Sequence, residues 1–507
     1  MFAELGSILT VFTPSFLLVM LAGVFGGLVI GAMPGLTSTM AVALLVPITY
    51  GMSMELGIAM LVAVYIGAIS GGLVAAALLN IPGTPSSVAT TFDAYPMVQR
   101  GEAGRALAIG VFASFAGGFF SFLVMVTVSP LLGRFALRFA SYEYFALVIF
   151  TLTTIISLSR ASLIKGVISA CMGLLMACAG LSDIDTAVRF TFGIEDLQTG
   201  FNALPVLIGM YAISQIMEEI RTINEPYKLT YASFTWKEFW HVIKTDFGPR
   251  ENLYNFFRSS LIGTGIGILP GVGPGLSNIL AYTQAKQSSK DPESFGKGNP
   301  NGIIASESAN NASTGGAMIP LLTLGIPGDS TTLMMLGAFM IHGIQPGPLL
   351  FRDSGSLVAL IFAAYFVSNC FMLLLQVQFI RVLIKSLSAP RHILYPVIMA
   401  LCVIGSFSLN SNMFDAWVFF YMGIVGFFMV MCKFPLLPLV LGLLLGGMME
   451  REFRTSWVHG GDSLAGFLDR PIALGFLFVA ALSLSWSLYQ HYKANKKGEA
   501  LQAAAEQ

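Results

Sequence analysis

Residues 80–87 read Asn-Ile-Pro-Gly-Thr-Pro-Ser-Ser, and residues 325–332 read Gly-Ile-Pro-Gly-Asp-Ser-Thr-Thr. Each copy combines helix-breaking Pro and Gly with a run of hydroxyl side chains inside an apolar chain. Backbone with unpaired N–H and C=O groups is tolerated at membrane depth only where it lines a cavity within protein. Broken segments at corresponding places in two halves therefore predict the substrate site of a transporter.

The duplication extends upstream of these two motifs. Residues 31–36 read Gly-Ala-Met-Pro-Gly-Leu and residues 267–272 read Gly-Ile-Leu-Pro-Gly-Val, and a Gly-Gly pair follows each (Gly71-Gly72 and Gly315-Gly316). Because the order is preserved in both halves, we expect two structural repeats. Hydropathy leaves inverted and parallel repeats open, and we favour inverted ones. The repeats cover two ranges, about residues 8–140 and 257–390. A hydrophilic insertion in the second, residues 284–301, is expected to form a solvent-exposed loop.

The composition indicates an integral membrane protein. Hydrophobic residues make up 55% of the 507 and charged residues 11%, whereas a soluble domain carries about a quarter charged residues. Apolar runs of about 20 residues predict an all-α polytopic protein with about 10–12 transmembrane helices, and their length excludes an outer-membrane barrel. A net charge of zero implies no nucleic-acid partner. Met1-Phe2-Ala3-Glu4 lacks the basic region of a secretory signal, so the first apolar run is expected to remain as a span.

The longest polar stretch separates the two halves. It runs from Glu218 to Ser260 and carries six basic residues, Lys228 among them, which predicts a cytoplasmic location. Residues 234–243 place Phe, Trp and Ile on one helical face, as in an interfacial amphipathic helix; a linker helix packed on the protein is the alternative. The predicted divisions are a first transmembrane half (1–217), a cytoplasmic linker with this helix (218–256), a second transmembrane half (257–490) and a flexible cytoplasmic tail (491–507).

The chemistry of the first motif suits a carboxylate. Pro82 and Gly83 stop a helix, Thr84 is a good N-cap, and Pro85 fits the first position of a new helix. Such a half-helix presents unpaired backbone N–H groups and a positive dipole end beside hydroxyl groups, so it can bind a carboxylate without arginine. The substrate-binding candidates are Asn80, Pro82, Gly83, Thr84, Ser86, Ser87, Gly328, Ser330, Thr331 and Thr332.

The second motif differs because it carries an acid. Asp329 would repel a carboxylate, so it is expected to attract a coupling cation, Na⁺ or H⁺; a simple N-cap is the alternative. Residues 34–39 and 270–278 resemble tips of re-entrant hairpins, with kinked ordinary helices as the alternative. Glu307, Asn310 and Asn311 belong to a polar cluster that either lines the site or forms a loop. The candidates for cation coupling are Asp329, Thr37, Ser38, Ser277, Asn278, Asn310 and Asn311.

Enzymatic interpretations have little support. The five histidines are scattered without a metal-binding motif, and the chain has no phosphate-binding loop. Ser70, within Gly67-Ala-Ile-Ser-Gly71, superficially resembles an intramembrane nucleophile, but it lacks a histidine partner and reads more simply as a packing residue. The Gly-Gly pairs are interpreted as points of close helix packing. We therefore predict no enzyme activity, no cofactor and no tightly bound metal.

At these motifs the chain resembles the large permease subunit of the bacterial tripartite tricarboxylate transporters. The residues that carry the resemblance are 31–36, 79–87, 92–96 (Phe-Asp-Ala-Tyr-Pro), 267–275, 307–312 and 325–330. The resemblance covers essentially the whole chain. It implies paired hairpins and an elevator-like motion, as in the ion-transporter superfamily. It also implies a small four-span membrane subunit and a periplasmic solute-binding protein as partners.

The resulting hypothesis is a multi-pass subunit of the bacterial inner membrane, embedded in lipid, that imports citrate-like tricarboxylates or related organic acids with a cation. The two motifs, residues 80–87 and 325–332, are its substrate and ion candidates. A gated organic-anion channel or exporter is the first alternative, and an intramembrane enzyme using Ser70 is a remote one. The identity of the acid and the choice between Na⁺ and H⁺ stay open at this point.

Overall fold

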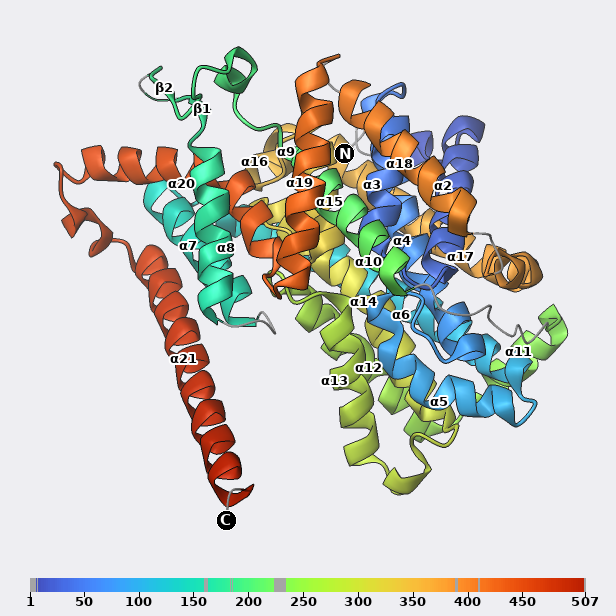
Figure 1. Cartoon of the computed structure of the whole chain (residues 1–507). Helices are drawn as coiled ribbons and strands as arrows, with labels where there is room; N and C mark the ends of the chain where they lie inside the picture. Colours follow the sequence, from blue (N-terminus) through green and yellow to red (C-terminus); the bar gives the residue numbers. More distant parts are fainter. Residues whose placement is uncertain are drawn as a thin grey trace. The chain divides into compact units, whose positions relative to one another are not determined.

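A computed structural model of the chain describes residues 6, 8–158, 163–182, 184, 186–222, 234–387, 391–408 and 411–505. Across these ranges the chain is helical except for loops and one antiparallel pairing of β1 (Gly180–Leu181) with β2 (Val188–Arg189) (Figure 1). Seven of the described helices are long and apolar enough to cross a membrane, and shorter apolar helices accompany them. The prediction of an all-α polytopic membrane protein is confirmed. Met1–Glu4 and Lys228, used above, lie outside the described residues.

The chain forms two compact units that interleave along the sequence. Unit 1 combines residues 1–137 with 211–416, and unit 2 combines residues 138–210 with 417–507. Both repeats belong to unit 1. The halves predicted from the sequence, which end at residue 217 and begin at residue 257, follow the order of the two repeats. They do not coincide with the two units, which are defined by which residues pack together.

The two repeats contribute similar series of long helices to unit 1, although their short elements differ. The first contains α2 (Pro14–Ala32), α3 (Ser38–Thr49), α4 (Met54–Leu79), η1 (Pro85–Ser87), α5 (Val88–Gln99) and α6 (Ala103–Ala136). The second contains α12 (Arg250–Ile268), α13 (Gly273–Ser288), η4 (Pro292–Ser294), α14 (Pro300–Leu324), α15 (Ser330–Ile341), α16 (Pro348–Asp353) and α17 (Gly355–Ser386). The remaining helices of unit 1 are α10 (Ser214–Thr222), α11 (Trp236–Asp246) and α18 (Arg391–Ser408). The π-helix η3 (Gly209–Ile213) and α19 (Met413–Met431) each include residues of both units.

The two repeats also share positive φ angles at equivalent positions. Gly35 and Gly271, in the turns after α2 and α12, have φ values of 88° and 76°. Asn80 and Gly325, which end α4 and α14, have φ values of 58° and 70°. This left-handed region is open to Gly and, among other residues, most readily to Asn and Asp. The repeated residues therefore specify the same two reversals of the chain.

The Gly-Gly pairs allow helix backbones to touch. A Cβ atom built on Gly71 of α4 would lie 2.5 Å from the carbonyl oxygen of Leu28 on α2. At the equivalent point, a Cβ atom on Gly316 of α14 would lie 2.4 Å from the carbonyl oxygen of Thr264 on α12. No side chain fits at these distances, so the predicted packing role is confirmed.

The two repeats run in opposite directions. Tyr65, in the first half of α4, contacts Asp329, which lies beyond the end of α14. Thr90, which lies beyond the end of α4, contacts Ser306 in the first half of α14. The equivalent helices α4 and α14 are therefore antiparallel, as expected for inverted repeats. In Figure 1, α3 packs on α15 toward the upper end of unit 1, whereas α13 packs on α5 toward its lower end.

Helix α11 packs on unit 1 while keeping indole groups exposed. It begins with a capping box in which Thr235 donates to Glu238, and these hydrogen bonds lower the pKa of the Glu238 carboxyl. Phe239 is fully buried against Phe112 of α6, while the Trp240 side chain is 50% exposed. The helix is thus anchored on the protein, and an interfacial role for its exposed face stays a prediction.

Unit 2 is a smaller helical assembly. Its helices are α7 (Ser141–Leu158), α8 (Leu163–Ala177), η2 (Glu195–Thr199), α9 (Ala203–Ile208), α20 (Leu436–His459), η5 (Leu464–Phe467) and α21 (Pro471–Ala505), with most of α19. Helix α20 packs on α8 and α7, and α21 packs on α7. A small core of Tyr142, Ala146, Phe467 and Ala473 joins α7 to the start of α21.

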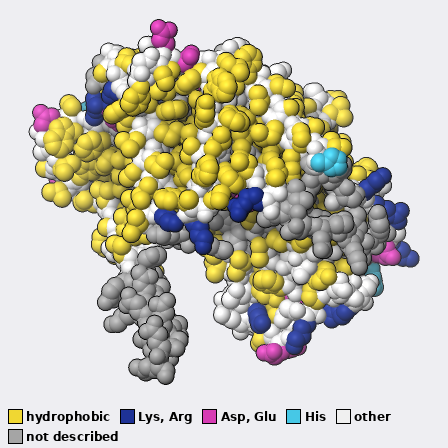
Figure 2. All heavy atoms as spheres, viewed as in Figure 1, with side chains coloured by type: hydrophobic (Ala, Val, Ile, Leu, Met, Phe, Trp, Pro, Cys, Tyr) yellow, Lys and Arg dark blue, Asp and Glu magenta, His cyan; other side chains and the backbone are white. Residues whose placement is uncertain are grey.

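The surface of unit 1 changes character along its length. Figure 2 shows hydrophobic side chains over most of the visible face, and some of the Lys, Arg, Asp and Glu side chains lie at its lower end, where Figure 1 places α13 and the loop that follows it. Exposed apolar side chains such as Leu261 and Leu280 lie on α12 and α13. This distribution is that of a membrane protein whose apolar belt ends at a polar face.

Candidate functional site

Four helix starts meet inside unit 1. The Ser38 hydroxyl at the start of α3 lies 2.8 Å from the Thr331 hydroxyl at the start of α15. A Cβ atom on Gly273, the first residue of α13, would lie 3.3 Å from Cβ of Asp329, and one on Gly275 would lie 3.4 Å from the carbonyl oxygen of Pro85 in η1. We call this region the helix-start cluster, made of Ser38, Thr39, Thr84, Ser86, Ser87, Gly273, Gly275, Asp329, Thr331 and Thr332.

Both broken segments begin new helices as predicted. Asp329 is the N-cap of α15, and its Oδ1 accepts from the Thr332 amide at 2.6 Å. Thr84 occupies the same position before η1, where its hydroxyl lies 2.8 Å from that of Ser86. Both residues are therefore N-caps, and a role of Asp329 in attracting a cation stays a prediction. Hydroxyl groups and amide N–H groups of helix starts are therefore concentrated in one buried place.

Asp329 is a buried carboxyl held by neutral donors. Its side chain is 4% exposed. Oδ2 accepts from the Tyr65 hydroxyl at 2.7 Å, and Oδ1 accepts from the Thr332 hydroxyl at 2.7 Å. Within the described part of the chain no Lys or Arg pairs with it. A buried carboxylate without a cationic partner either takes up a proton or attracts a cation.

A second buried carboxyl, Glu307, lies in the middle of unit 1. It is fully buried on α14; Oε1 accepts from the Thr90 hydroxyl at 2.6 Å and Oε2 from the Ser114 hydroxyl at 2.8 Å. The alternative that Glu307 and its neighbours form a loop is wrong, because residues 300–324 form one continuous helix with a buried middle. The polar residues of this stretch face the protein interior because no water is available to solvate them in the apolar belt.

Amide side chains connect this helix to its neighbours. Asn278 of α13 accepts from the Ala89 amide at 2.7 Å and donates to the Ser306 carbonyl at 3.1 Å. Asn311 accepts from the Ser70 hydroxyl at 2.5 Å, so Ser70 is a hydrogen-bond donor as well as a packing residue. Asn310 Nδ2 donates to the Ile69 carbonyl at 3.4 Å, whereas its buried Oδ1 lacks a hydrogen-bond partner in the part of the chain that the structure describes. An unsatisfied buried amide oxygen is a ready acceptor for a cation or a water molecule.

Several other candidates from the sequence lie at turns or at close contacts between backbones. Asn80 is exposed at the end of α4, and Pro82 beside it is half-buried. A Cβ atom on Gly83 would lie 2.6 Å from the Gly31 carbonyl, and one on Gly328 would lie 2.4 Å from the carbonyl oxygen of Gly267. These positions bring the broken segments against α2 and α12. Remaining placements are Thr37, the half-buried N-cap of α3; Ser277, buried and donating to the Pro274 carbonyl; and Ser330, half-buried at the start of α15.

Sequence reasoning missed several residues that complete this interior. Tyr65 and Ser114 lie within long apolar runs, and Thr90 lies in α5 just before residues 92–96, outside the motifs named above. A polar residue inside an apolar run is the only signal that marks them, and that signal does not name the partner.

Asp93 is a third buried carboxyl, and it holds the loop before α14. Its Oδ1 accepts from three backbone amides, at 2.9 Å from Gly296, 2.8 Å from Gly298 and 2.7 Å from Asn299. Its Oδ2 accepts from the Tyr282 hydroxyl at 2.9 Å. The insertion predicted as a solvent-exposed loop is in part helical, because residues 284–288 continue α13 and residues 300–301 begin α14. Residues 289–299 connect the two helices, and Asp93 tethers the end of this connection although residues 290–293 are exposed.

Comparisons with known proteins bear on this arrangement. Residues 17–441 match the model of a family described as the tripartite tricarboxylate transporter TctA family. The chain is 34% identical over 470 residues to an uncharacterized 52.8 kDa protein in the TAR-I ttuC' 3' region of Agrobacterium vitis, covering 93% of this chain and 92% of that protein. It is also 34% identical over 234 residues to an uncharacterized protein in the TAR-II ttuC' 3' region of Agrobacterium vitis, covering 46% of this chain and 97% of that protein. No solved structure matches.

Proposed function

The chain belongs to the tripartite tricarboxylate transporter TctA family, and we propose that it imports carboxylates as the large membrane subunit of such a transporter. Its substrates are citrate-like tricarboxylates or related organic acids. The membrane is the bacterial inner membrane, and import is secondary transport coupled to a Na⁺ or H⁺ gradient. The partners are a small four-span membrane subunit and a periplasmic solute-binding protein that delivers the acid.

The observation that carries this proposal is the helix-start cluster. Four helices begin there, which brings their positive dipole ends to one place; α13 has no side-chain cap, whereas the N-caps of α3 and α15 each accept from one amide N–H and leave others of the first turn free. The residues that define the cluster are hydroxyl residues, glycines and one acid. Binding through helix starts and hydroxyl groups suits an anion with several carboxylates, since each carboxylate can take donors from a different helix. It also permits release, because no arginine holds the anion in a tight ion pair.

We assign the coupling cation to the buried carboxyl of Asp329, which belongs to the helix-start cluster. The buried Glu307 carboxyl and the unsatisfied Oδ1 of Asn310, three residues further along α14, are a second candidate site for it. A cation that neutralises Asp329 removes the repulsion between this carboxylate and the incoming acid. Ion and substrate then bind in mutual dependence, as coupled transport requires.

The test is uptake of labelled citrate into proteoliposomes that contain this chain and its small subunit. Na⁺ and H⁺ gradients are imposed separately, with and without the binding protein. Uptake that needs both a gradient and the binding protein supports the proposal. Uptake that needs neither a gradient nor the binding protein favours a channel. If citrate is not taken up but another organic acid is, the transport mechanism stands and only the proposed substrate changes.

A pair of variants tests the cluster itself. Thr331→Val removes the hydroxyl that contacts Ser38 and Thr39 and is expected to raise the KM for the acid. Thr127→Val is the matched control, because the Thr127 hydroxyl is exposed and binds only carbonyl groups of its own helix. Equal KM values for the two variants would contradict a role for the cluster in substrate binding.

A further inference from the structure

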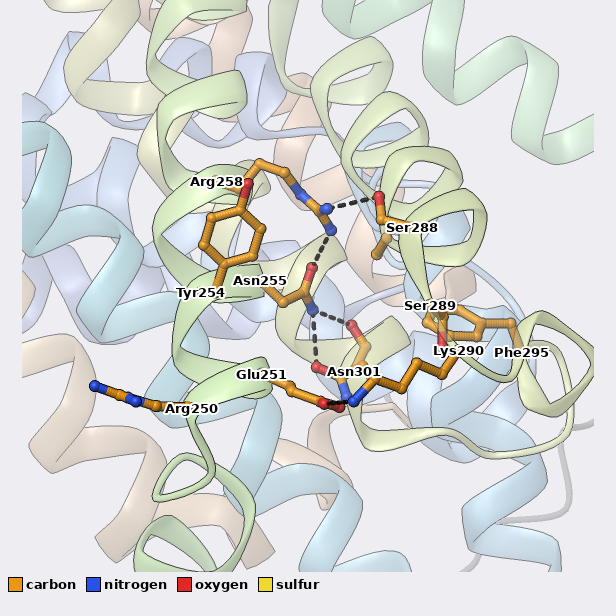
Figure 3. Close-up of a pocket in the computed structure, with 11 residues that line it drawn as sticks. Arg250, Glu251, Tyr254, Asn255, Arg258, Ser288, Ser289, Lys290, Phe295 and Asn301 are labelled. Carbon is orange, nitrogen blue, oxygen red and sulfur yellow. Dashed lines mark hydrogen bonds and ion pairs between the residues drawn. The ribbon is translucent and has the colours of Figure 1, made fainter.

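A pocket with a cavity of about 510 Å³ lies between α12, α13 and the loop before α14 (Figure 3). It is separate from the helix-start cluster, which lies at the opposite ends of α12 and α13. Its walls include Arg258 and Tyr254 of α12, Ser288 of α13, and Lys290 and Phe295 of the loop. Asn255 fixes one wall, because its Nδ2 donates to the backbone and side-chain oxygens of Asn301 at 2.9 and 3.0 Å.

Arg258 carries an uncompensated charge into this pocket. Its Nη1 donates to the Ser288 hydroxyl at 2.6 Å and its Nη2 to Asn255 Oδ1 at 2.8 Å, while its buried Nε has no hydrogen-bond partner among the described residues. The guanidinium also lies over the Tyr254 ring, 5.6 Å from the centroid. All of these partners are neutral. Glu251 lines the same pocket, but it pairs with Lys290 (Figure 3). The guanidinium is thus positioned by neutral groups and keeps donor capacity for an anion.

The outer face of α12 leads from this pocket along an apolar surface. Tyr254, Phe257 and Leu261 are 67%, 50% and 64% exposed, and their spacing places them on one side of the helix. An exposed apolar row of this kind on a membrane protein suits contact with lipid acyl chains. The pocket lies at the charged end of unit 1, where Figure 2 shows Lys and Arg below the apolar surface. An aromatic side chain beside arginine at this level is typical of the membrane–water boundary.

We propose that this pocket binds the phosphate of an anionic lipid headgroup. The guanidinium of Arg258 offers fork-shaped donors that match phosphate oxygens, and Lys290 at the rim neutralises Glu251, which would otherwise repel the phosphate. The acyl chains lie along Tyr254, Phe257 and Leu261. Basic pockets beside transmembrane helices recognise anionic headgroups in this way. The proposal requires that the chain is embedded in a membrane, and it is independent of the transported acid.

The experiment is native mass spectrometry of the full chain in detergent micelles titrated with phosphatidylglycerol or phosphatidylcholine. The expected result is preferential retention of phosphatidylglycerol, with an affinity that falls about tenfold or more in Arg258→Gln because charge-assisted hydrogen bonds are lost. Arg352→Gln is the matched control, since Arg352 is an exposed arginine paired with Asp353 on α16. Equal retention of both lipids, or an unchanged affinity in Arg258→Gln, would overturn the proposal.

Two further measurements distinguish a lipid from a soluble anion and guard against misfolding of the arginine variant. Inorganic phosphate and citrate are added as competitors at matched ionic strength, and displacement of phosphatidylglycerol by either would assign the pocket to a soluble anion and overturn the lipid source. Lys290→Gln changes an exposed loop residue, so it is expected to fold and to weaken binding in the same direction. If the Arg258→Gln variant does not fold, the lipid affinity of the Lys290→Gln variant serves as the test. An unchanged affinity for phosphatidylglycerol in that variant would reject the site. These binding measurements stand whether or not citrate is transported.

Discussion

The Tyr65 hydroxyl donates a 2.7 Å hydrogen bond to Oδ2 of Asp329, and so joins α4 of the first repeat to the start of α15 in the second. Both side chains are buried. The bond links the two repeats at the broken segment that carries the acid. A change in the charge of Asp329 therefore directly changes its hydrogen bond to the first repeat.

Removing this donor is expected to destabilise the protein. Tyr65→Phe leaves a buried carboxylate oxygen without one of its partners, which costs about 1–3 kcal/mol. Thermal unfolding in detergent measures the loss, and Tyr254→Phe, an exposed tyrosine, is the control. In a double-mutant cycle with Asp329→Asn, additive effects would contradict a direct interaction between Tyr65 and Asp329.

Glu307→Gln is expected to abolish gradient-driven accumulation of the acid while leaving exchange of the acid across the membrane intact. Glutamine keeps an acceptor for Thr90 or Ser114 but cannot bind a proton or supply a full negative charge to a cation. Gradient-driven uptake of the acid should fall to background while exchange of acid across the membrane persists. The measurement compares both modes in the same proteoliposomes, with Glu102→Gln at the protein surface as control. Intact gradient-driven accumulation in Glu307→Gln would remove Glu307 from the coupling site.

The close packing of α12 on α14 predicts opposite effects at two neighbouring glycines. A Cβ atom on Gly267 would lie 2.4 Å from the Ser313 carbonyl, so Gly267→Ala should destabilise the protein by about 1–3 kcal/mol or more. A Cβ atom on Gly265 meets nothing within 4 Å, so Gly265→Ala should be neutral or stabilise by up to about 1 kcal/mol. Thermal unfolding compares the two. Similar melting temperatures would show that the backbone contact at Gly267 is absent.

Asp93 is expected to protect the loop before α14 from proteolysis. Asp93→Ala removes the acceptor for the amides of Gly296, Gly298 and Asn299, which flank Lys297. Since a hydrogen bond to a charged group contributes about 1.5–3 kcal/mol, the loop should open often enough for trypsin to cleave after Lys297. Limited proteolysis followed by mass spectrometry measures the rate at this bond. Glu102→Ala serves as control, and equal rates in both variants would count against the tether.

Much of the architecture was predictable because it depends on local chemistry. Pro82-Gly83 and Pro327-Gly328 cannot continue a helix, so both breaks follow from the residues themselves. Thr84 and Asp329 were recognisable as N-caps for the same reason. The length of the apolar runs predicted membrane-crossing helices, since burial of about 20 apolar residues is required by bilayer thickness.

The interior of the site was less predictable because its residues are distant in sequence. Thr90, Ser114 and Glu307 come from three helices, and nothing in their local sequence indicates that they meet. The cation candidates Ser277 and Asn278 were chosen for position after a Pro-Gly turn, yet Asn278 connects α13 to α5 through hydrogen bonds. A polar side chain buried in a membrane must find a partner, but the partner depends on how the helices pack.

The sequence by itself determined the number and order of helix breaks, the duplication and the membrane environment, because backbone preferences and hydrophobicity act over a few residues. Only the tertiary structure decided that the repeats are inverted, that four helix starts share one buried place, and that Tyr65 reaches Asp329. These relationships arise from packing glycine faces such as Gly71 and Gly316 against neighbouring backbones. Packing brings together residues hundreds of positions apart, and no local preference encodes such contacts.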